Sequence, residues 1–115
     1  MQRDSAYLLD ILESAELILR YVEGRKYQDF ATETAFQDQV IRRFQIIGEA
    51  ARRVSDETRK HLPSIPWRAM IGLRNVLIHE YGEVDPQRLW KTVHEELPQL
   101  IAQLRPEVPP PSADV

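Results

Sequence analysis

Four side chains that could do chemistry stand close together between positions 74 and 81 of this 115-residue chain. They are the guanidinium of Arg74, the amide of Asn75, the imidazole of His79 and the phenol of Tyr81. An imidazole can move a proton near neutral pH. A guanidinium can hold a phosphate and stabilise the charge that grows on its oxygens. The grouping therefore predicts cleavage of a phosphodiester, centred on this segment.

The rest of the composition restricts how such a cleavage could proceed. The chain has no cysteine, which excludes disulfides, thiolate zinc sites and cysteine nucleophiles. No cluster of carboxylates suggests a two-metal nuclease, and His61 and His94 show no helical ligand spacing with His79. We therefore expect no metal and no other cofactor. The chemistry that fits these groups is cleavage of RNA through the ribose 2′-hydroxyl.

The element that must position these groups is a helix over residues 67–79, and Arg74 holds an unusual place on it. At about 100° per residue, Arg74 falls near the centre of an apolar stripe. A guanidinium in a packed seam is costly unless it is paired or lines a cavity. The alternative to a functional arginine is one that extends to solvent or pairs with a carboxylate such as Glu49. The other members of the stripe are Trp67, Met70, Ile71, Leu77 and Ile78.

A second face of the same helix carries Asn75 and His79, together with Arg68 and Gly72. Arg74 and His79 are five residues apart, which separates them by about 140° around a straight helix. One helix therefore does not aim both side chains at a single atom. Either the helix loosens before His79, or a second copy of the chain completes the site, as a two-fold homodimer would.

The charge of the chain is unevenly distributed. The formal net charge is −3, yet the stretch from Arg42 to Arg74 holds eight cations against three anions. Arginine pairs on helices are usually solvated surface, and the acidic total argues against a wholly basic nucleic-acid coat. The concentration of cations around the candidate site is nevertheless compatible with an RNA-binding face that includes Arg68.

Apolar residues at three- and four-residue steps predict an all-α protein. Gly24 is placed to cap the first helix, and residues 55–58 could begin a short extra turn. Pro98 falls inside the last stripe, where we expect a kink or a break. Short connections between the amphipathic helices indicate an antiparallel bundle of four to five helices. The expected helices cover residues 4–22, 34–54, 67–79 and 86–104.

We expect one domain over residues 1–105 and a proline-rich, disordered tail over residues 106–115. No apolar run approaches the roughly 20 residues that span a bilayer, and the N-terminus does not look like a signal peptide. These features predict a cytoplasmic protein with no membrane partner.

The segment Arg74-Asn75-Val76-Leu77-Ile78-His79 resembles the signature of the HEPN superfamily, an arginine followed by a polar residue and, after a short gap, a histidine. Tyr81 resembles the additional tyrosine of the HepT-like toxins of prokaryotic toxin–antitoxin pairs. The flanking sequences agree with the HepT-like pattern, and the resemblance covers roughly residues 4–104. These flanks are Ile47-Gly48-Glu49-Ala50, Pro66-Trp67, Leu89-Trp90 and Glu96-Leu97-Pro98-Gln99-Leu100.

The resemblance implies a homodimeric HEPN bundle in which two Arg–His motifs meet in a cleft. It implies a metal-independent endoribonuclease with Arg74 and His79 as catalytic residues and Asn75 as a polar helper. It also implies the toxin of a type VII-like toxin–antitoxin pair, whose partner is a minimal nucleotidyltransferase antitoxin. That partner can block such a toxin by transferring AMP from ATP to the tyrosine, here Tyr81.

Two other interpretations remain open at the level of the sequence. The first is a non-catalytic HEPN dimer that binds the nucleotidyltransferase and is modified by it. The intact pair of Arg74 and His79 favours the enzyme, and both interpretations predict modification of Tyr81. The second is a bundle that only dimerises, which leaves the position of Arg74 unexplained.

Overall fold

A computed structural model describes residues 2–79 and 84–108, with only the backbone of Gln2 and His79. These residues form α-helices and one short 3-10 helix, with no strand among them, which confirms the predicted all-α class. The α-helices are α1 (Gln2–Val22), α2 (Tyr27–Thr32), α3 (Thr34–Arg53), α4 (Asp56–His61), α5 (Trp67–His79), α6 (Pro86–Glu95) and α7 (Leu97–Leu104).

The N-terminal half contains one helix that periodicity did not predict. Gly24 follows α1 with a φ of 71°, the left-handed conformation expected of a glycine cap. The chain then forms α2, whose first turn is held by a hydrogen bond of 2.9 Å from the Lys26 backbone N–H to the Asp29 carboxylate. Six residues are too few to display a helical period, and Phe30 is the residue of α2 that lies buried.

The short helix α4 is tied to the start of α1 by a buried carboxylate. Asp4 accepts hydrogen bonds of 2.6 Å from the hydroxyls of Ser55 and Thr58, and one of 3.0 Å from the Ser55 backbone N–H. Ser55 also caps α4 by accepting from the Thr58 backbone N–H at 3.2 Å. The predicted extra turn is therefore a true helix.

The prolines of the C-terminal half divide it as predicted. Asp85 caps α6 by accepting from the Gln87 backbone N–H at 3.0 Å, and Pro86 is the first residue of that helix. The helix ends at Glu95, and α7 begins at Leu97 with Pro98 in its first turn. The predicted kink at Pro98 is thus a break between two helices.

Packing continues past the predicted domain boundary at residue 105. Residues 105–107 form the 3-10 helix, which packs against α1 and α7, and Val108 is buried. The remaining tail, residues 109–115, lies outside the described residues.

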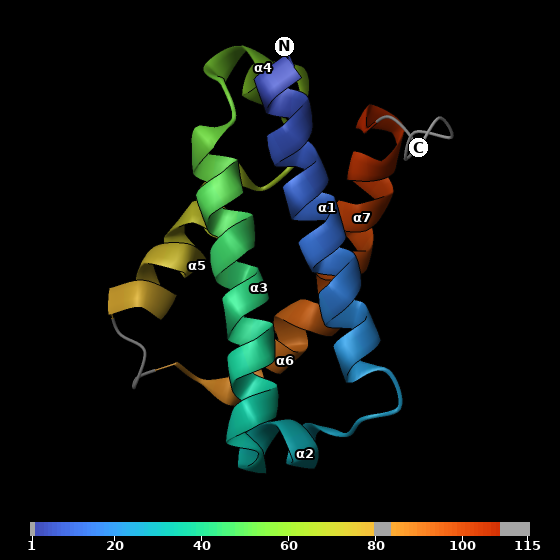
Figure 1. Ribbon diagram of the computed structural model, residues 1–115, viewed down its shortest axis with the longest axis vertical. Coiled ribbons are helices and arrows are strands. Elements are labelled where there is room, and N and C mark those ends of the chain that lie inside the picture. The colour runs from blue at the N-terminus through green and yellow to red at the C-terminus, as the bar shows by residue number, and fades with distance from the viewer. Residues whose placement is uncertain (1, 80–83, 109–115) are drawn as a thin grey trace.

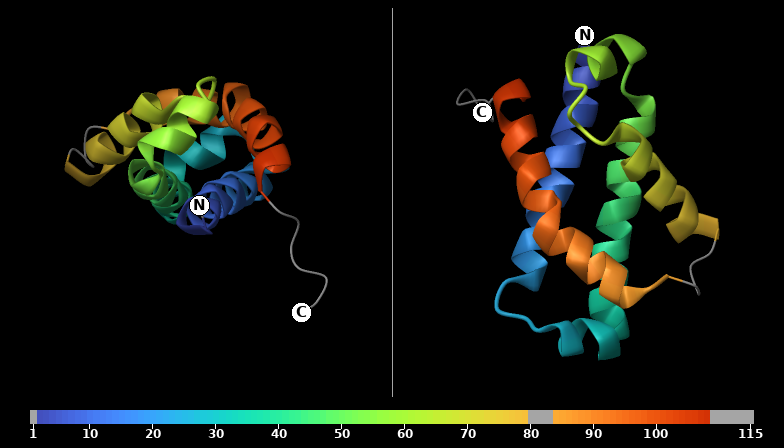
Figure 2. Two further views of the ribbon diagram at one scale, coloured as in Figure 1. Left: turned by 90° about the horizontal axis from the view of Figure 1, so that it is seen from above. Right: turned by 180° about the vertical axis from the view of Figure 1, so that it is seen from behind.

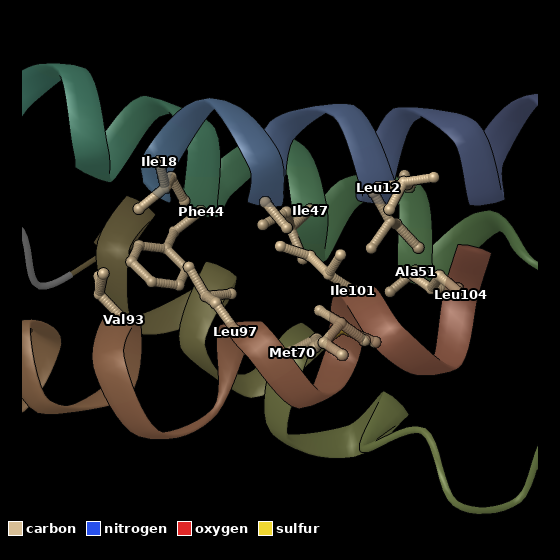
Figure 3. Close-up of a cluster of buried hydrophobic side chains, with 14 of the residues drawn as sticks. Leu12, Ile18, Phe44, Ile47, Ala51, Met70, Val93, Leu97, Ile101 and Leu104 are labelled. Carbon is tan, nitrogen blue, oxygen red and sulfur yellow. The ribbon is translucent and has the colours of Figure 1, made fainter. Parts of the chain in front are cut away.

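The two long helices α1 and α3 run side by side along the molecule, and the short helices α2 and α4 lie at its two ends (Figure 1). Seen from above, α5 lies on the α3 side of this pair and α7 on the α1 side (Figure 2). Figure 3 shows the core between them, where side chains of α1 and α3 meet those of α5, α6 and α7. No helix in the described part of the chain is long and apolar enough to cross a membrane.

Candidate functional site

The helix that carries the predicted site, α5, is anchored at both ends and packs mainly against α3. At its start, the Trp67 indole N–H donates to the Leu62 carbonyl oxygen at 3.0 Å. Near its end, Leu77 is fully buried, and the Gln45 amide of α3 donates to the Leu77 carbonyl oxygen at 3.5 Å. These contacts fix which face of α5 meets α3.

Gly48 allows α5 to approach α3 closely. A Cβ at this position would lie 2.7 Å from the Met70 carbonyl oxygen and 2.9 Å from Cγ of Arg74, and it would overlap Cβ of Arg74. The missing side chain of Gly48 therefore makes room for the stem of Arg74 where the two helices cross.

Arg74 lies at this crossing, as its place in the apolar stripe predicted. Its side chain is 23% exposed, and its Nη2 lies 3.0 Å from Oε2 of Glu49. Its Nη1 donates to Oδ1 of Asn75 at 3.0 Å. The guanidinium thus connects α3 to the outward part of α5. Its carboxylate partner is Glu49, the residue that the sequence suggested for an arginine held by pairing rather than for catalysis.

The carboxylate of Glu49 contacts three guanidinium groups. Its Oε1 accepts from Arg52 Nη2 at 2.9 Å and from Arg53 Nε at 3.0 Å, while Oε2 faces Arg74. The hydrogen bonds from Arg52 and Arg53 lower the pKa of Glu49 from 4.5 to about 2, against the effect of burial, and the charge of Arg74 adds to them. One carboxylate cannot neutralise three cations, so the cluster keeps an excess of positive charge.

The contact between Glu49 and Arg74 is an ion pair without a well-oriented hydrogen bond. Oε2 of Glu49 and Nε of Arg74 are both buried, and neither has a hydrogen-bond partner in the structure. A buried donor that is left unpaired carries a free-energy penalty of about 1–3 kcal/mol.

The outward face of α5 carries the other predicted residues. Arg68, Gly72 and Asn75 are exposed, as their shared helical face predicted. An arginine can only donate, so its contact with Asn75 occupies the amide oxygen and leaves the amide N–H groups for another partner. His79 is the last residue of α5 and its side chain lies outside the described residues, as does Tyr81. The structure therefore joins Arg74, Asn75 and Glu49 and leaves the placement of His79 and Tyr81 as predictions.

The apolar stripe of α5 is narrower than the sequence suggested. Trp67, Met70 and Leu77 are buried, but Ile78 is 43% exposed. Val76, on another side of the helix, is 41% exposed. Helix α5 thus presents large apolar side chains to its surroundings on two sides.

A pocket of about 370 Å³ opens beside Arg74, between α1, α3 and α5. We call it the arginine pocket. Residues of all three helices line it, and sequence reasoning did not assign a role to most of them; they include Tyr7, Asp10, Arg42, Gln45, Ile46, Glu49, Arg53, Arg74 and Ile78. The spacing of Glu49 and Arg53, one helical turn apart, is the signal that could have pointed to part of it.

A larger groove of about 690 Å³ lies on the other flank of α5. Its floor is apolar, with Phe44, Met70 and Leu97 among its residues, and charged residues of α6 stand at its rim. None of Arg68, Arg74 and Asn75 lines it. Within residues 2–79 and 84–108, no three His, Asp or Glu side chains gather closely enough to hold a metal ion.

Comparison with known proteins identifies a protein family that matches this chain. A family model described as "Ribonuclease HepT-like" matches residues 11–106. A Methanocaldococcus jannaschii protein named "Putative RNase" is 41% identical over 95 residues, covering 83% of this chain and 87% of that protein.

Two further relatives come from other organisms. A Thermococcus cleftensis protein named "Probable ribonuclease HepT" is 43% identical over 94 residues, covering 82% of this chain and 86% of that protein. A Caldanaerobacter subterraneus protein named "Putative RNase" is 32% identical over 105 residues, covering 91% and 94%. No solved structure matches the chain significantly.

Proposed function

Because this chain belongs to the HepT-like ribonuclease family, we propose that it is a metal-independent endoribonuclease and the toxin of a type VII-like toxin–antitoxin pair. The observation that carries the proposal is the position of Arg74, a guanidinium held between Glu49 and Asn75 at the edge of an apolar core. A pair with Glu49 alone would fit a purely structural arginine, but Glu49 also accepts from Arg52 and Arg53, so the three cations keep an excess of positive charge that a negatively charged substrate would balance.

The cleavage would use the substrate's own ribose. His79 accepts the proton of the 2′-hydroxyl, whose oxygen attacks the adjacent phosphorus. The bond from phosphorus to the 5′-oxygen breaks, and that oxygen leaves with a proton. The products are a 2′,3′-cyclic phosphate and a 5′-hydroxyl. Arg74 stabilises the charge on the phosphoryl oxygens, and Asn75 supplies a further hydrogen-bond donor.

A second copy of the chain completes this site in the proposal. The helical spacing of Arg74 and His79 separates them by about 140°, so a two-fold dimer that pairs the motifs would bring the histidine of one protomer toward the arginine of the other. A second imidazole would also be available to protonate the leaving oxygen.

The central experiment compares the wild type with Arg74→Ala and His79→Ala on a defined RNA oligomer in EDTA. We expect the wild type to cut and both variants to lose cleavage, with unchanged circular dichroism. An otherwise identical oligomer with a 2′-deoxy sugar at the cut site should stay intact. Cutting of that oligomer, or loss of activity on chelation, would contradict the mechanism.

Control by a partner is proposed at Tyr81. A cognate nucleotidyltransferase antitoxin would transfer AMP to the phenol, adding bulk and negative charge where the phosphate of RNA must bind. On co-expression, the peptide containing Tyr81 should gain the mass of AMP, and Tyr81→Phe should lose the adduct and escape neutralisation. A neutralised complex with unmodified Tyr81 would mean that the antitoxin acts by binding alone. Modification of a wild type that cuts no RNA would favour the non-catalytic dimer.

A further inference from the structure

The arginine pocket has the composition of a nucleotide site. We infer that it holds one nucleotide of the RNA, the one adjacent to the phosphate that Arg74 binds, with its phosphate on Arg53 and Arg42 and its base against Ile78. The inference rests on the proposed function and extends it from the reacting bond to the path of the substrate.

Charge is the first argument. Arg42, Arg53 and Arg74 line the pocket against the two carboxylates Asp10 and Glu49. Glu49 is already shared among three guanidinium groups. Its depressed pKa reflects the same excess of cations around it. A pocket with more guanidinium groups than carboxylates favours an anion, and arginine is the side chain best suited to phosphate.

The remaining walls suit a base. Ile46, Tyr7 and Ile78 contribute apolar and aromatic surface, and Gln45 contributes an amide that can donate to or accept from a base edge. Ile78 is 43% exposed, which is unfavourable for a large apolar side chain unless something covers it. The volume, about 370 Å³, lies within the range of about 300–1,000 Å³ common for small-molecule sites.

Continuity with the motif is the third argument. The guanidinium of Arg74 reaches Asn75 with Nη1 and Glu49, on the pocket wall, with Nη2. A chain of phosphates that contacts the outward face of α5 at Asn75 would therefore pass Arg74 to enter the pocket. A nucleotide combines a phosphate with a flat base, so it matches both the cationic and the apolar parts of the pocket lining. A second copy of the chain would have to place a charged and an apolar side chain at the same two parts.

The test compares two neighbouring arginines, of which Arg53 also hydrogen-bonds Tyr7 on the pocket wall. Arg52 and Arg53 bond the same oxygen of Glu49, at 2.9 and 3.0 Å, and their side chains are 52% and 55% exposed. Only Arg53 lines the pocket. Arg53→Gln and Arg52→Gln thus remove the same charge and the same kind of Glu49 contact. The probe is an RNA oligomer that carries a 2′-deoxy sugar at the cut site, and its dissociation constant is measured by fluorescence anisotropy at several salt concentrations.

We expect Arg53→Gln to weaken binding about tenfold, the effect of one charge-assisted hydrogen bond. The salt slope, which is the change in the logarithm of the binding constant with the logarithm of the salt concentration, should fall in magnitude by about 1. Arg52→Gln should weaken binding much less. Ile78→Ala should weaken binding several-fold without changing the salt slope, whereas Val76→Ala, equally exposed but outside the pocket, should not. An oligomer one nucleotide shorter on the pocket side should bind the wild type and Arg53→Gln with similar affinity.

Equal effects of Arg53→Gln and Arg52→Gln, together with equal effects of the Ile78 and Val76 variants, would overturn the inference while leaving RNA cleavage by Arg74 intact. If the measured mass of Arg53→Gln falls from that of a dimer to that of a monomer, the pocket binds a second copy of the chain instead. A wild type that neither binds nor cuts RNA would overturn the proposed function, and the inference with it.

Discussion

Arg74 Nη2 lies 3.0 Å from Glu49 Oε2, across the contact between α5 and α3, at a point where Gly48 leaves room for the arginine stem. This ion pair links the helix of the proposed active site to the helix that supplies most of the surrounding charge. Several consequences for stability and activity can be measured.

Replacing Glu49 with glutamine should destabilise the fold at neutral pH and reduce RNA cleavage, because Arg74 loses its charged partner. The pKa of Glu49 is lowered from 4.5 to about 2, so its contribution to stability is complete above pH 4.5 and is lost as the pH falls toward 2. The difference in unfolding free energy between the wild type and Glu49→Gln should therefore shrink over that interval in urea titrations. Glu57→Gln removes an exposed carboxylate of α4 and serves as the control; a difference that stays constant with pH would contradict the assignment.

Replacing Arg74 with methionine should separate function from stability. Methionine keeps an unbranched apolar stem like that of arginine, although it is shorter, and it suits the apolar stripe. Glu49 would keep its hydrogen bonds from Arg52 and Arg53. Removing a partly buried charge in this way is often neutral or stabilising, so we expect a change within about 1 kcal/mol or a gain. RNA cleavage should be abolished. Thermal unfolding and a cleavage assay on the same preparation test both parts, and retained cleavage would remove Arg74 from the mechanism.

The two helical glycines should respond in opposite directions to alanine. Gly48→Ala places a Cβ against Arg74 and Met70, and overpacking of this kind costs about 1–3 kcal/mol. A Cβ at Gly72 meets nothing within 4 Å, and alanine is favoured over glycine in a helix by about 0.5–1 kcal/mol. Urea denaturation should show a lower unfolding free energy than the wild type for Gly48→Ala and a higher one for Gly72→Ala. If Gly72→Ala raises stability but lowers RNA binding, a ligand approaches the α5 backbone at this position.

Asp4→Asn should weaken the attachment of α4 to α1. The carboxylate accepts three hydrogen bonds from Ser55 and Thr58, and these bonds, the Ser55 hydroxyl first, lower its pKa. Hydrogen bonds to charged groups contribute about 1.5–3 kcal/mol, so we expect a loss of about 2 kcal/mol in unfolding free energy. Glu13→Gln, an exposed carboxylate of α1, should change stability little. Equal stability of the two variants would show that Asp4 is not an anchor.

Much of the fold could be predicted from local patterns. The periods of α1, α3 and α5, the cap at Asp85 and the break at Pro98 all depend on interactions within a few residues, which a sequence displays directly. Helix α2 escaped prediction because six residues cannot show a period, and packing against α3 and α6 stabilises it instead.

The sequence by itself also determined that Arg74 occupies an apolar stripe and that Asn75 shares a face with Arg68 and Gly72, because both follow from helical geometry. It offered Glu49 as one partner of Arg74 among several alternatives. Only the tertiary structure decided that Arg74 of α5 joins the local contacts of Arg52 and Arg53 on this carboxylate, and that Gly48 is the crossing point of two helices. The arginine pocket likewise joins residues from α1, α3 and α5. The period of a helix is set by hydrogen bonds four residues apart, whereas the contact between two helices is set by side-chain packing over tens of residues of separation, which no local pattern encodes.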